Sequence, residues 1–414
     1  MSLKVLFLSR AYPNNVTPTM GLWVARLVHA LSDQCEPRVI SPVPYSPPLP
    51  GLPEFTRFRK IDAQRQEENV TVYHPRFLVG PGYALHSSEA LMYYLGVRRL
   101  VDRLRGEFAF DVIHAHFSYP DGVVGARLGQ RYGVPVVATE HACWRPWMDQ
   151  FPLARRQAVH AAAKLSFHIA VSTHVRNTIA HFTGETERIR VIPVGVDGAI
   201  FRRAHDGKFN RRQILYVGFI NYNKGVDVLL KAMHQIRKRQ SDVRLVLVGG
   251  SIYRNTRLQQ EQLEKMAQDL ELGDRVTFVG PKTSEEVARY MRESAVVVLP
   301  SRRESFGAVL VEALACGTPV VATRCGGPED IITDEVGVLV APEDENALAQ
   351  GIEHVLENRS NYAGARLRQY ALQRFSWNRV ANDTANLYRE ASGIVASKNG
   401  KQWETEAEII PAKH

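Results

Sequence analysis

The chain has 414 residues with a formal net charge of +9, and 45% of its residues are hydrophobic and 23% charged. This composition excludes a disordered or fibrous chain and predicts a folded protein of two or three domains. The basic excess attracts phosphates, nucleic acid or anionic lipid without choosing among them. Because nucleic-acid binding would rest on net charge alone, we expect none.

Targeting signals and disulfides are not expected. No apolar run approaches the roughly 18 residues of a membrane-spanning helix. The start, MSLKVLFLSR, leads directly into a strand pattern without the apolar core of a secretory signal. The four cysteines are far apart and form no C-x-x-C pair, which suits core residues in a reducing compartment. We therefore expect a cytoplasmic protein.

Short runs rich in Val and Ile alternate with helical patterns along the chain, which indicates βαβ units. In the first half the runs begin at residues 4, 38, 70, 111, 134, 167 and 189, and in the second at 213, 243, 275, 295, 318 and 337. Several are apolar at successive positions, as in parallel strands covered on both faces. The predicted fold class is α/β, with two doubly wound, Rossmann-like parallel sheets facing across a cleft.

The weakly periodic segment 194–212 is rich in Gly, Arg and Asp and marks a connection between domains, with a hinge near Pro193. We expect one domain over residues 1–193 and a second over 194–376. Residues 377–396 are helical, and 397–414 are expected to form a flexible tail.

The arginine-rich segment 98–105, RRLVDRLR, interleaves its arginines with Leu100, Val101 and Leu104. A helix of this kind could lie on an anionic membrane surface, although an ordinary solvated helix shows the same pattern. A peripheral position on the inner face of the membrane is therefore an alternative to a freely diffusing protein.

Two loops in the first half carry candidate ligand groups. Gly21 opens a helix at the carboxyl end of the first strand, which suits an anion, although a structural glycine explains it equally well. His114 and His116 lie two apart on a strand end and face the same side. With no third ligand cluster nearby, we expect no metal. We expect His116 at the mouth of the cleft, bound to a substrate, and His114 as a satisfied core histidine.

Two loops in the second half carry charged candidates. Lys224 precedes a helix and could neutralise a diphosphate, although such a lysine is usually just solvated. The segment ESFGAVLVEALACG places Glu304 before a helix that begins around residues 306–308, and Glu312 beside its apolar stripe. The first-turn N–H groups of that helix suit a phosphate or sugar hydroxyl, and Gly307 permits close approach. The alternative is an exposed helix Glu and a loop Glu in a salt bridge.

Several enzyme motifs are missing from the sequence. It contains no G-x-x-x-x-G-K-[ST] phosphate loop and no G-x-G-x-x-G dinucleotide fingerprint. It also lacks a G-x-S-x-G nucleophile elbow and an Asp-x-Asp pair for a divalent metal. Kinase, dehydrogenase and hydrolase functions therefore lose support.

The segment ESFGAVLVEALACGTPVVAT resembles the E-x7-E segment of the family 4 retaining glycosyltransferases. The likeness extends through GLWVARLVHAL, DVIHAHFSYPDG, ATEH, AVSTHVRNTI, VIPVGVD, YVGFINYNKGVDVLLKA, RVTFVG and FSW. The resemblance implies the two-domain GT-B fold and a nucleotide diphosphate sugar donor, with no bound metal and no cofactor. It also implies that residues 1–193 bind the acceptor, that residues 194–376 bind the donor, and that the helix 377–396 returns to the first domain.

The resemblance also implies roles for individual residues in donor binding. Glu304 matches the acid that holds donor sugar hydroxyls near the anomeric carbon, and Glu312 matches the acid that accepts the ribose hydroxyls. Gly21 and Lys224 match diphosphate contacts. The remaining implied donor contacts are Gly218, Ser305, Phe306, Gly307, Val309 and Leu310.

On the acceptor side, His116 matches a histidine that touches the transferred sugar and the acceptor, and His141 of ATEH joins it. One departure concerns the diphosphate. The family usually has Arg directly after the VG of the segment that ends in KG, where this chain has Phe219. Either Lys224 and the helix dipole suffice, or an arginine such as Arg302 or Arg303 substitutes.

The implied function is transfer of a hexosyl unit, with retention, from a nucleotide diphosphate sugar to a carbohydrate or lipid-linked acceptor. A UDP-sugar is the default donor, and cell-surface polysaccharide or glycolipid synthesis is the expected setting. Two alternatives stay open: a non-catalytic nucleotide-sugar-binding or scaffold protein, and a nucleotide-sugar epimerase of the same fold.

Overall fold

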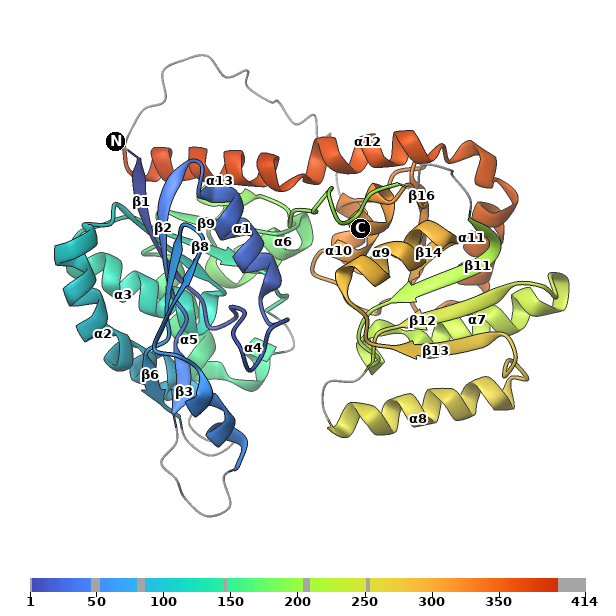
Figure 1. Ribbon diagram of the computed structural model, residues 1–414, viewed down its shortest axis with the longest axis horizontal. Coiled ribbons are helices and arrows are strands. Elements are labelled where there is room, and N and C mark those ends of the chain that lie inside the picture. Colours follow the sequence, from blue (N-terminus) through green and yellow to red (C-terminus); the bar gives the residue numbers. More distant parts are fainter. Residues whose placement is uncertain are drawn as a thin grey trace.

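The computed structural model describes residues 2–45, 53–79, 86–144, 147–203, 209–250 and 254–393. The predicted tail, 397–414, lies outside these ranges. Two α/β domains lie side by side, and a long helical segment runs along both of them (Figure 1). Within the described ranges, no helix combines the length and apolar character needed to cross a bilayer.

The first domain is built on an eight-stranded sheet. Its strands, in spatial order, are β10 (Ile189–Val191), β9 (Phe167–Ala170), β8 (Val136–Glu140), β7 (Val112–His116), β1 (Leu3–Leu8), β2 (Cys35–Ile40), β5 (Val70–Tyr73) and β4 (Gln64–Glu67). All neighbours pair in parallel except β4 and β5, which are antiparallel. A small parallel pair, β3 (Val43–Tyr45) and β6 (Arg76–Leu78), lies beside it.

The second domain is built on a six-stranded sheet in which every pair is parallel. Its strands, in spatial order, are β13 (Val276–Gly280), β12 (Arg244–Val248), β11 (Asn210–Val217), β14 (Ser294–Leu299), β15 (Val320–Thr323) and β16 (Gly337–Val340). The central strands are fully buried, as their continuous apolar sequences predict. The predicted fold class is therefore confirmed.

Every strand that the sequence predicts is present, and β3, β4 and β6 are additional. The strand β4 has the sequence QRQE and is partly exposed along its length, so it carries no apolar run. As the antiparallel edge of the sheet it needs no buried side chains. The strands β3 and β6 have three residues each, too few for a period to show.

Helices cover both sheets. Those of the first domain are α1 (Leu22–Leu31), α2 (Glu89–Phe108), α3 (Val123–Tyr132), α4 (Trp147–Gln150), α5 (Pro152–Ala162) and α6 (Thr173–Thr183). Those that follow are α7 (Val226–Arg239), α8 (Arg254–Asp269), α9 (Ser284–Glu293), α10 (Ala308–Ala315), α11 (Glu345–Glu357), α12 (Gly364–Phe375) and α13 (Trp377–Ala391). Short helical turns are η1 (Pro53–Lys60), η2 (His86–Ser88), η3 (Ser118–Gly122), η4 (Tyr222–Lys224), η5 (Gly327–Asp330) and η6 (Arg359–Asn361).

The helix α13 belongs to the first domain although its sequence follows the second. It leaves α12 directly and lies against α1 (Figure 1). Val380, Ala381 and Tyr388 share one apolar cluster with Val24 and Val28 of α1. The domains are therefore joined by two chain segments, one between β10 and β11 and one between α12 and α13. A hydrogen bond connects the two segments: the Val196 N–H donates to the Phe375 carbonyl at 2.7 Å.

Candidate active site at the facing strand ends

The strand orders of the two sheets place the predicted loops together. Each order reverses at one point, between β1 and β7 in the first sheet and between β11 and β14 in the second. Ligands of open parallel sheets bind beyond the carboxyl ends of the strands at such points. Gly21 follows β1, His116 ends β7, Lys224 follows β11 and Glu304 follows β14. The candidate site is therefore built at both reversal points.

Lys224 and Glu304 form an ion pair. The Lys224 Nζ donates to Glu304 Oε2 at 2.6 Å, and the side chains are 22% and 15% exposed. Ser301 adds a long hydrogen bond to the same oxygen at 3.4 Å. The Glu304 backbone is fixed as well, since its N–H donates to the Cys325 carbonyl at 3.2 Å and its carbonyl accepts from the Gly327 N–H at 2.8 Å. Two residues predicted separately therefore lie together: Lys224 is not simply solvated, and Glu304 is in a salt bridge, as the alternative interpretation of this loop allowed.

The helix α10 begins directly after this acid. Gly307 occupies its N-cap with φ +95°, a left-handed conformation that side chains rarely adopt, and no side chain caps the helix. The first-turn N–H groups of Ala308 and Val309 therefore come shortly after Glu304 in the chain, and among the described residues no side chain occupies them. Leu310 is fully buried and donates its N–H to the Gly307 carbonyl at 2.9 Å. Phe306 is 4% exposed and packs its ring edge against Phe375, so only its backbone can face a ligand.

Glu312 lies in the second turn of α10 and is partly buried. Burial raises the pKa of its carboxyl from 4.5 to about 7, and the positive charge of Arg26 opposes that rise. Arg26 belongs to α1 of the first domain, and its Nη2 donates to the Ser284 hydroxyl of α9 at 3.4 Å. A cation of the first domain therefore contacts the second domain at Ser284, and its charge acts on Glu312. Sequence reasoning missed Arg26, because its effect on Glu312 links residues far apart in the chain.

Ser305, predicted as a donor contact, is held by the first domain. Its hydroxyl accepts from the Cys143 N–H at 3.2 Å, and its carbonyl accepts from the Ser172 hydroxyl at 2.6 Å. Beside it, the Thr173 N–H donates to Asp330 Oδ2 at 2.5 Å. The start of α6 thus grips the loop that carries Glu304. Cys143 and Ser172 were missed in the sequence because no spacing reveals a contact between two sheets.

The remaining glycines occupy close backbone contacts. Gly21 has φ +71°, and a Cβ placed on it would lie 2.0 Å from the Ala11 carbonyl oxygen. This position therefore tolerates no side chain, whatever its role toward a ligand. Gly218 follows β11 and donates its N–H to the Val248 carbonyl at 3.0 Å.

Arg302 does not replace the missing cation at Phe219. Its guanidinium makes two hydrogen bonds to Asp227 at 2.8 and 2.7 Å and one to Glu343 at 2.9 Å, and it stacks on Tyr222. Such a bidentate pair fixes the side chain. Phe219 itself is 52% exposed. Of the two arginines proposed as substitutes, only Arg303 is exposed.

The three histidines form a stacked cluster. His114 and His116 are fully buried, whereas His141 is partly exposed. His116 Nδ1 lies 2.9 Å from His141 Nε2, and both rings are nearly parallel at 5.2 Å. Burial lowers the pKa of His114 and His141 to about 3, and that of His116 well below its ordinary value. All three are therefore neutral at pH 7.

The structure corrects the expected position of His116 at the mouth of the cleft. Its exposed fraction is 0%, because His141 and Phe7 cover it. Among the described residues, His116 Nε2 and His141 Nδ1 have no hydrogen-bond partner. His114 is the satisfied core histidine that the sequence suggests, since Tyr388 and Thr139 occupy its two ring nitrogens.

A pocket of about 230 Å³ opens beside the loop that follows β8. Its walls include Phe117, Tyr119, Glu140, Cys143, Trp144 and Met148. The Glu140 carboxylate accepts from the N–H groups of Ser118, His141 and Ala142 and from Trp144 Nε1, at 2.9 to 3.0 Å. Those four donors fill its accepting positions, so this acid shapes the pocket floor. The accessible surface of the pocket is mostly apolar.

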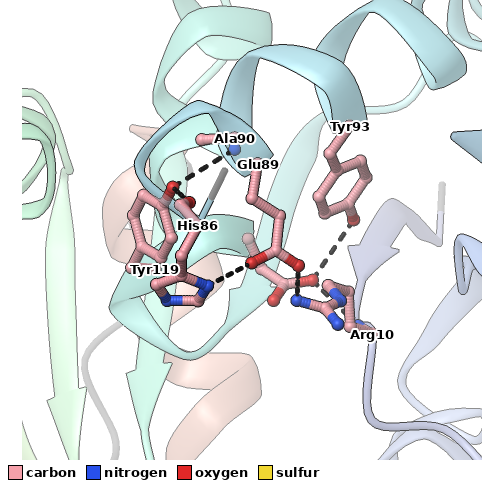
Figure 2. A network of polar contacts seen from close by, with 7 residues as sticks. Arg10, His86, Glu89, Ala90, Tyr93 and Tyr119 are labelled. Atoms are coloured by element: carbon pink, nitrogen blue, oxygen red, sulfur yellow. Dashed lines mark hydrogen bonds and ion pairs between the residues drawn. The ribbon is translucent and has the colours of Figure 1, made fainter. Parts of the chain in front are cut away.

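One pocket wall, Tyr119, is held by a buried polar network (Figure 2). Its hydroxyl bonds the His86 carbonyl, and the His86 ring lies 2.9 Å from Glu89, which also pairs with Arg10. The Arg10 N–H donates to Asp121 at 2.9 Å, and burial raises the pKa of Asp121 to about 7. The network ties the loop after β1 to the start of α2 and to η3, so the pocket wall is rigid.

No metal centre is evident in the described part of the chain. None of the His, Cys, Asp and Glu side chains there gather in a group of three that could hold an ion.

Comparisons with known proteins place both domains. Residues 20–199 match the family described as Glycosyltransferase Family 4, and residues 199–374 match Glycosyl transferases group 1. The D-inositol 3-phosphate glycosyltransferase of Acidothermus cellulolyticus is 32% identical over 368 residues, covering 81% of each chain. A protein of the same name from Pseudarthrobacter chlorophenolicus is 32% identical over 304 residues, covering 68% of this chain and 71% of that one.

Solved structures share the fold. Sucrose-phosphate synthase from Thermosynechococcus elongatus superposes with a TM-score of 0.78 at 23% identity, covering 95% of this chain and all of that one. Anabaena HepE in complex with UDP-glucose superposes with a TM-score of 0.69 at 22% identity, covering 94% of this chain and 100% of that one. These likenesses confirm the GT-B architecture.

The pKa of Glu312 predicts a pH-dependent stability. Between pH 4.5 and about 7 the unfolded chain has lost this proton while the folded chain keeps it, so the free energy of unfolding falls as pH rises through that window. Glu312→Gln cannot ionise and avoids the fall. We expect the variant to match the parent near pH ~5 and to exceed it by about 2 kcal/mol near pH ~8, by urea denaturation.

The matched control is Glu357→Gln, which changes an exposed glutamate at the end of α11. It should leave the pH dependence unchanged. An equal effect of Glu312→Gln at both pH values would show that Glu312 is ordinarily ionised in the folded chain.

Proposed function

Because the chain belongs to glycosyltransferase family 4, we propose that it moves a hexosyl unit from a nucleotide diphosphate sugar, a UDP-sugar first of all, to a carbohydrate or lipid-linked acceptor with retention. The observation that carries the proposal is the Lys224–Glu304 pair at 2.6 Å beside the uncapped start of α10. It sets a cation, an acid and free backbone N–H groups at one strand-order reversal. A diphosphate joined to a sugar needs this combination.

The donor would divide between these groups. Lys224 and the first turn of α10 at Val309 take the diphosphate, while Glu304 accepts sugar hydroxyls. Glu312, in the second turn of α10, accepts the ribose hydroxyls, and Gly21 lets the phosphates approach the first domain. In this arrangement Lys224 would lie between the diphosphate of the donor and Glu304. Its hydrogen bond to Glu304 orients the lysine before the donor binds.

The transfer needs no enzymic nucleophile. The leaving phosphate oxygen accepts the proton of the acceptor hydroxyl on the same face of the sugar, and the new glycosidic bond forms as the bond to phosphate breaks. Negative charge then grows on the diphosphate, where Lys224 and the α10 dipole stabilise it. We propose that this charge is balanced without a divalent metal.

The histidines act by hydrogen bonding, because neutral rings cannot offset phosphate charge. His141 is partly exposed and can reach a sugar or acceptor hydroxyl directly. His116 lies behind it, joined by a hydrogen bond at 2.9 Å. A contact between His116 and the transferred sugar requires a rearrangement that uncovers its Nε2, the ring nitrogen that has no partner among the described residues.

The acceptor would lie in the aromatic pocket beside His141. The partly exposed ring of Phe117 can stack on the apolar face of a sugar or pack against a lipid chain. The pocket neighbours Cys143, which contacts Ser305 next to Glu304. An acceptor held there meets the donor at the line between the two domains. Synthesis of a cell-surface polysaccharide or glycolipid is the setting we propose.

The acceptor domain also presents a face that suits an anionic membrane. Leu91 and Leu95 are each 42% exposed on α2, and Arg98, Arg99 and Arg103 follow on the same exposed face. Exposed leucines beside arginines are what an interfacial helix needs. We propose that α2 brings the enzyme to a lipid-linked acceptor at the inner face of the membrane.

A donor panel tests the proposed function. We expect nucleoside diphosphate release from one UDP- or GDP-sugar that depends on acceptor and persists in EDTA. The acceptors should include D-inositol 3-phosphate, which gives the two relatives their name. Donor binding without release would favour the non-catalytic alternative, and conversion of the donor sugar without acceptor would favour an epimerase. Activity lost in EDTA and restored by Mg²⁺ would overturn the metal-free mechanism.

Single substitutions test the assigned roles. Glu304→Ala and His116→Ala should each lower kcat by about 100-fold or more, because each removes a group that orients the reacting sugar. Glu357→Ala, at the exposed end of α11, is the control and should behave as the parent. Circular dichroism verifies the fold. Near-normal transfer by both site variants would reject the assignments.

Vesicle sedimentation tests the membrane face. Changing its three arginines to serine should lower partition onto anionic vesicles by about 100-fold at low salt, since each is worth about 1 kcal/mol at such a surface. Neutral vesicles should bind neither protein. The matched control changes three exposed arginines of the second domain: Arg244, Arg289 and Arg366. Absence of parent binding at low salt would remove the membrane proposal.

A further inference from the structure

The helix α13 carries a tyrosine hydroxyl into the histidine cluster of the first domain. Tyr388 Oη lies 2.5 Å from His114 Nδ1, and His114 Nε2 lies 2.7 Å from the Thr139 hydroxyl. Tyr388 and His114 are fully buried, and Thr139 is 4% exposed. The His114 ring is therefore held by two hydroxyls from two different elements, α13 and β8.

Both hydroxyls stay protonated, and the imidazole stays neutral. Burial raises the pKa of Tyr388 well above its ordinary value and lowers that of His114 to about 3. A neutral imidazole has one donor and one acceptor nitrogen, and each can pair with a hydroxyl. A flip of the His114 ring would break both hydrogen bonds in a buried place, which is costly. The ring plane is thus fixed.

His116 rests on this fixed ring. The ring centroids of His114 and His116 are 4.4 Å apart at an interplanar angle of 31°, and Phe7 contacts both rings. On its other side His116 stacks on His141. The hydrogen bond to His141 is the one ring hydrogen bond of His116 within the described residues. Its orientation therefore depends on the stack, and the stack depends on His114.

We propose that Tyr388 is a positioning residue for the His116–His141 pair and acts through the ring of His114. It touches no donor or acceptor. Its hydroxyl reaches His114 only when α13 is seated on α1, and α13 leaves α12 of the donor domain without a loop. The packing of α13 on α1 then also sets the orientation of His116 and His141. The proposal rests on the proposed function for its kinetic part.

Tyr388→Phe tests the proposal, since it keeps the ring and removes the hydroxyl. We expect kcat to fall about tenfold while the donor KM stays within about twofold, because the hydrogen-bonding pair is displaced and the donor site is untouched. Nitrogen-15 NMR of the histidine rings in the full chain should show shifted signals for His114, His116 and His141.

Two sets of control variants distinguish a loss of positioning from a loss of stability. Tyr370→Phe removes a comparable hydroxyl, which bonds the Ile331 carbonyl at 2.7 Å in the second domain, and it should leave the histidine signals in place. Thr139→Val removes the second hydroxyl from His114 and should reproduce the Tyr388→Phe effect. Thr139→Ser keeps a hydroxyl there and should restore parent signals and rate.

A double variant distinguishes a failure of the positioning role of Tyr388 from a failure of the role assigned to His116. In a His116→Ala background, Tyr388→Phe should lower kcat no further, because its effect passes through His116. An equal additional loss there, or unchanged His116 and His141 signals in Tyr388→Phe, overturns the positioning role. If His116→Ala transfers normally, the assignment of His116 fails, and the NMR signals alone then decide whether Tyr388 orients the pair.

Discussion

The constraint on which this structure depends is the direction of parallel strands. In each sheet the carboxyl ends of the parallel strands lie on one edge, and the strand order reverses once. The loops at that reversal therefore have no neighbouring loop to fill the space between them. Lys224 follows β11 and Glu304 follows β14, the two strands at the reversal, and they meet at 2.6 Å although 80 residues separate them. The pairing of acid and cation is a result of topology.

The same constraint decides how much the sequence could predict. Buried parallel strands are continuous apolar runs, so the two sheets and the loops after their strands could be read directly, and with them Glu304, Lys224 and His116. The sequence could not reveal which side chains from other elements pack against each of these residues. His116 is buried because it is covered by Phe7 of β1 and by His141 of the loop after β8. Arg302 is held by hydrogen bonds to Asp227. The polar edge strand β4 has no apolar signal at all.

Contacts with the first domain help to position the loop of the second domain that carries Glu304. Ser305 sits next to Glu304, yet its hydroxyl and carbonyl are bound by Cys143 and Ser172 of the first domain. Glu312 in turn feels Arg26 of α1. The surroundings of Ser305 and Glu312 are therefore set by both domains. A relative displacement of the domains would change the position of the loop that carries Glu304, and so would affect the sugar site that we propose there.

Charge in the site is distributed unevenly, and this limits what each group can do. Burial keeps the three histidines neutral, so the first-domain side of the cluster offers hydrogen bonds without positive charge. Arg302 is neutralised by Asp227 and Glu343. A bound diphosphate would then depend on Lys224 and the start of α10, with Arg303 exposed nearby in the chain. Since Lys224 already pairs with Glu304, part of its charge is offset, and in the mechanism that we propose a weaker attraction for the diphosphate would favour its release.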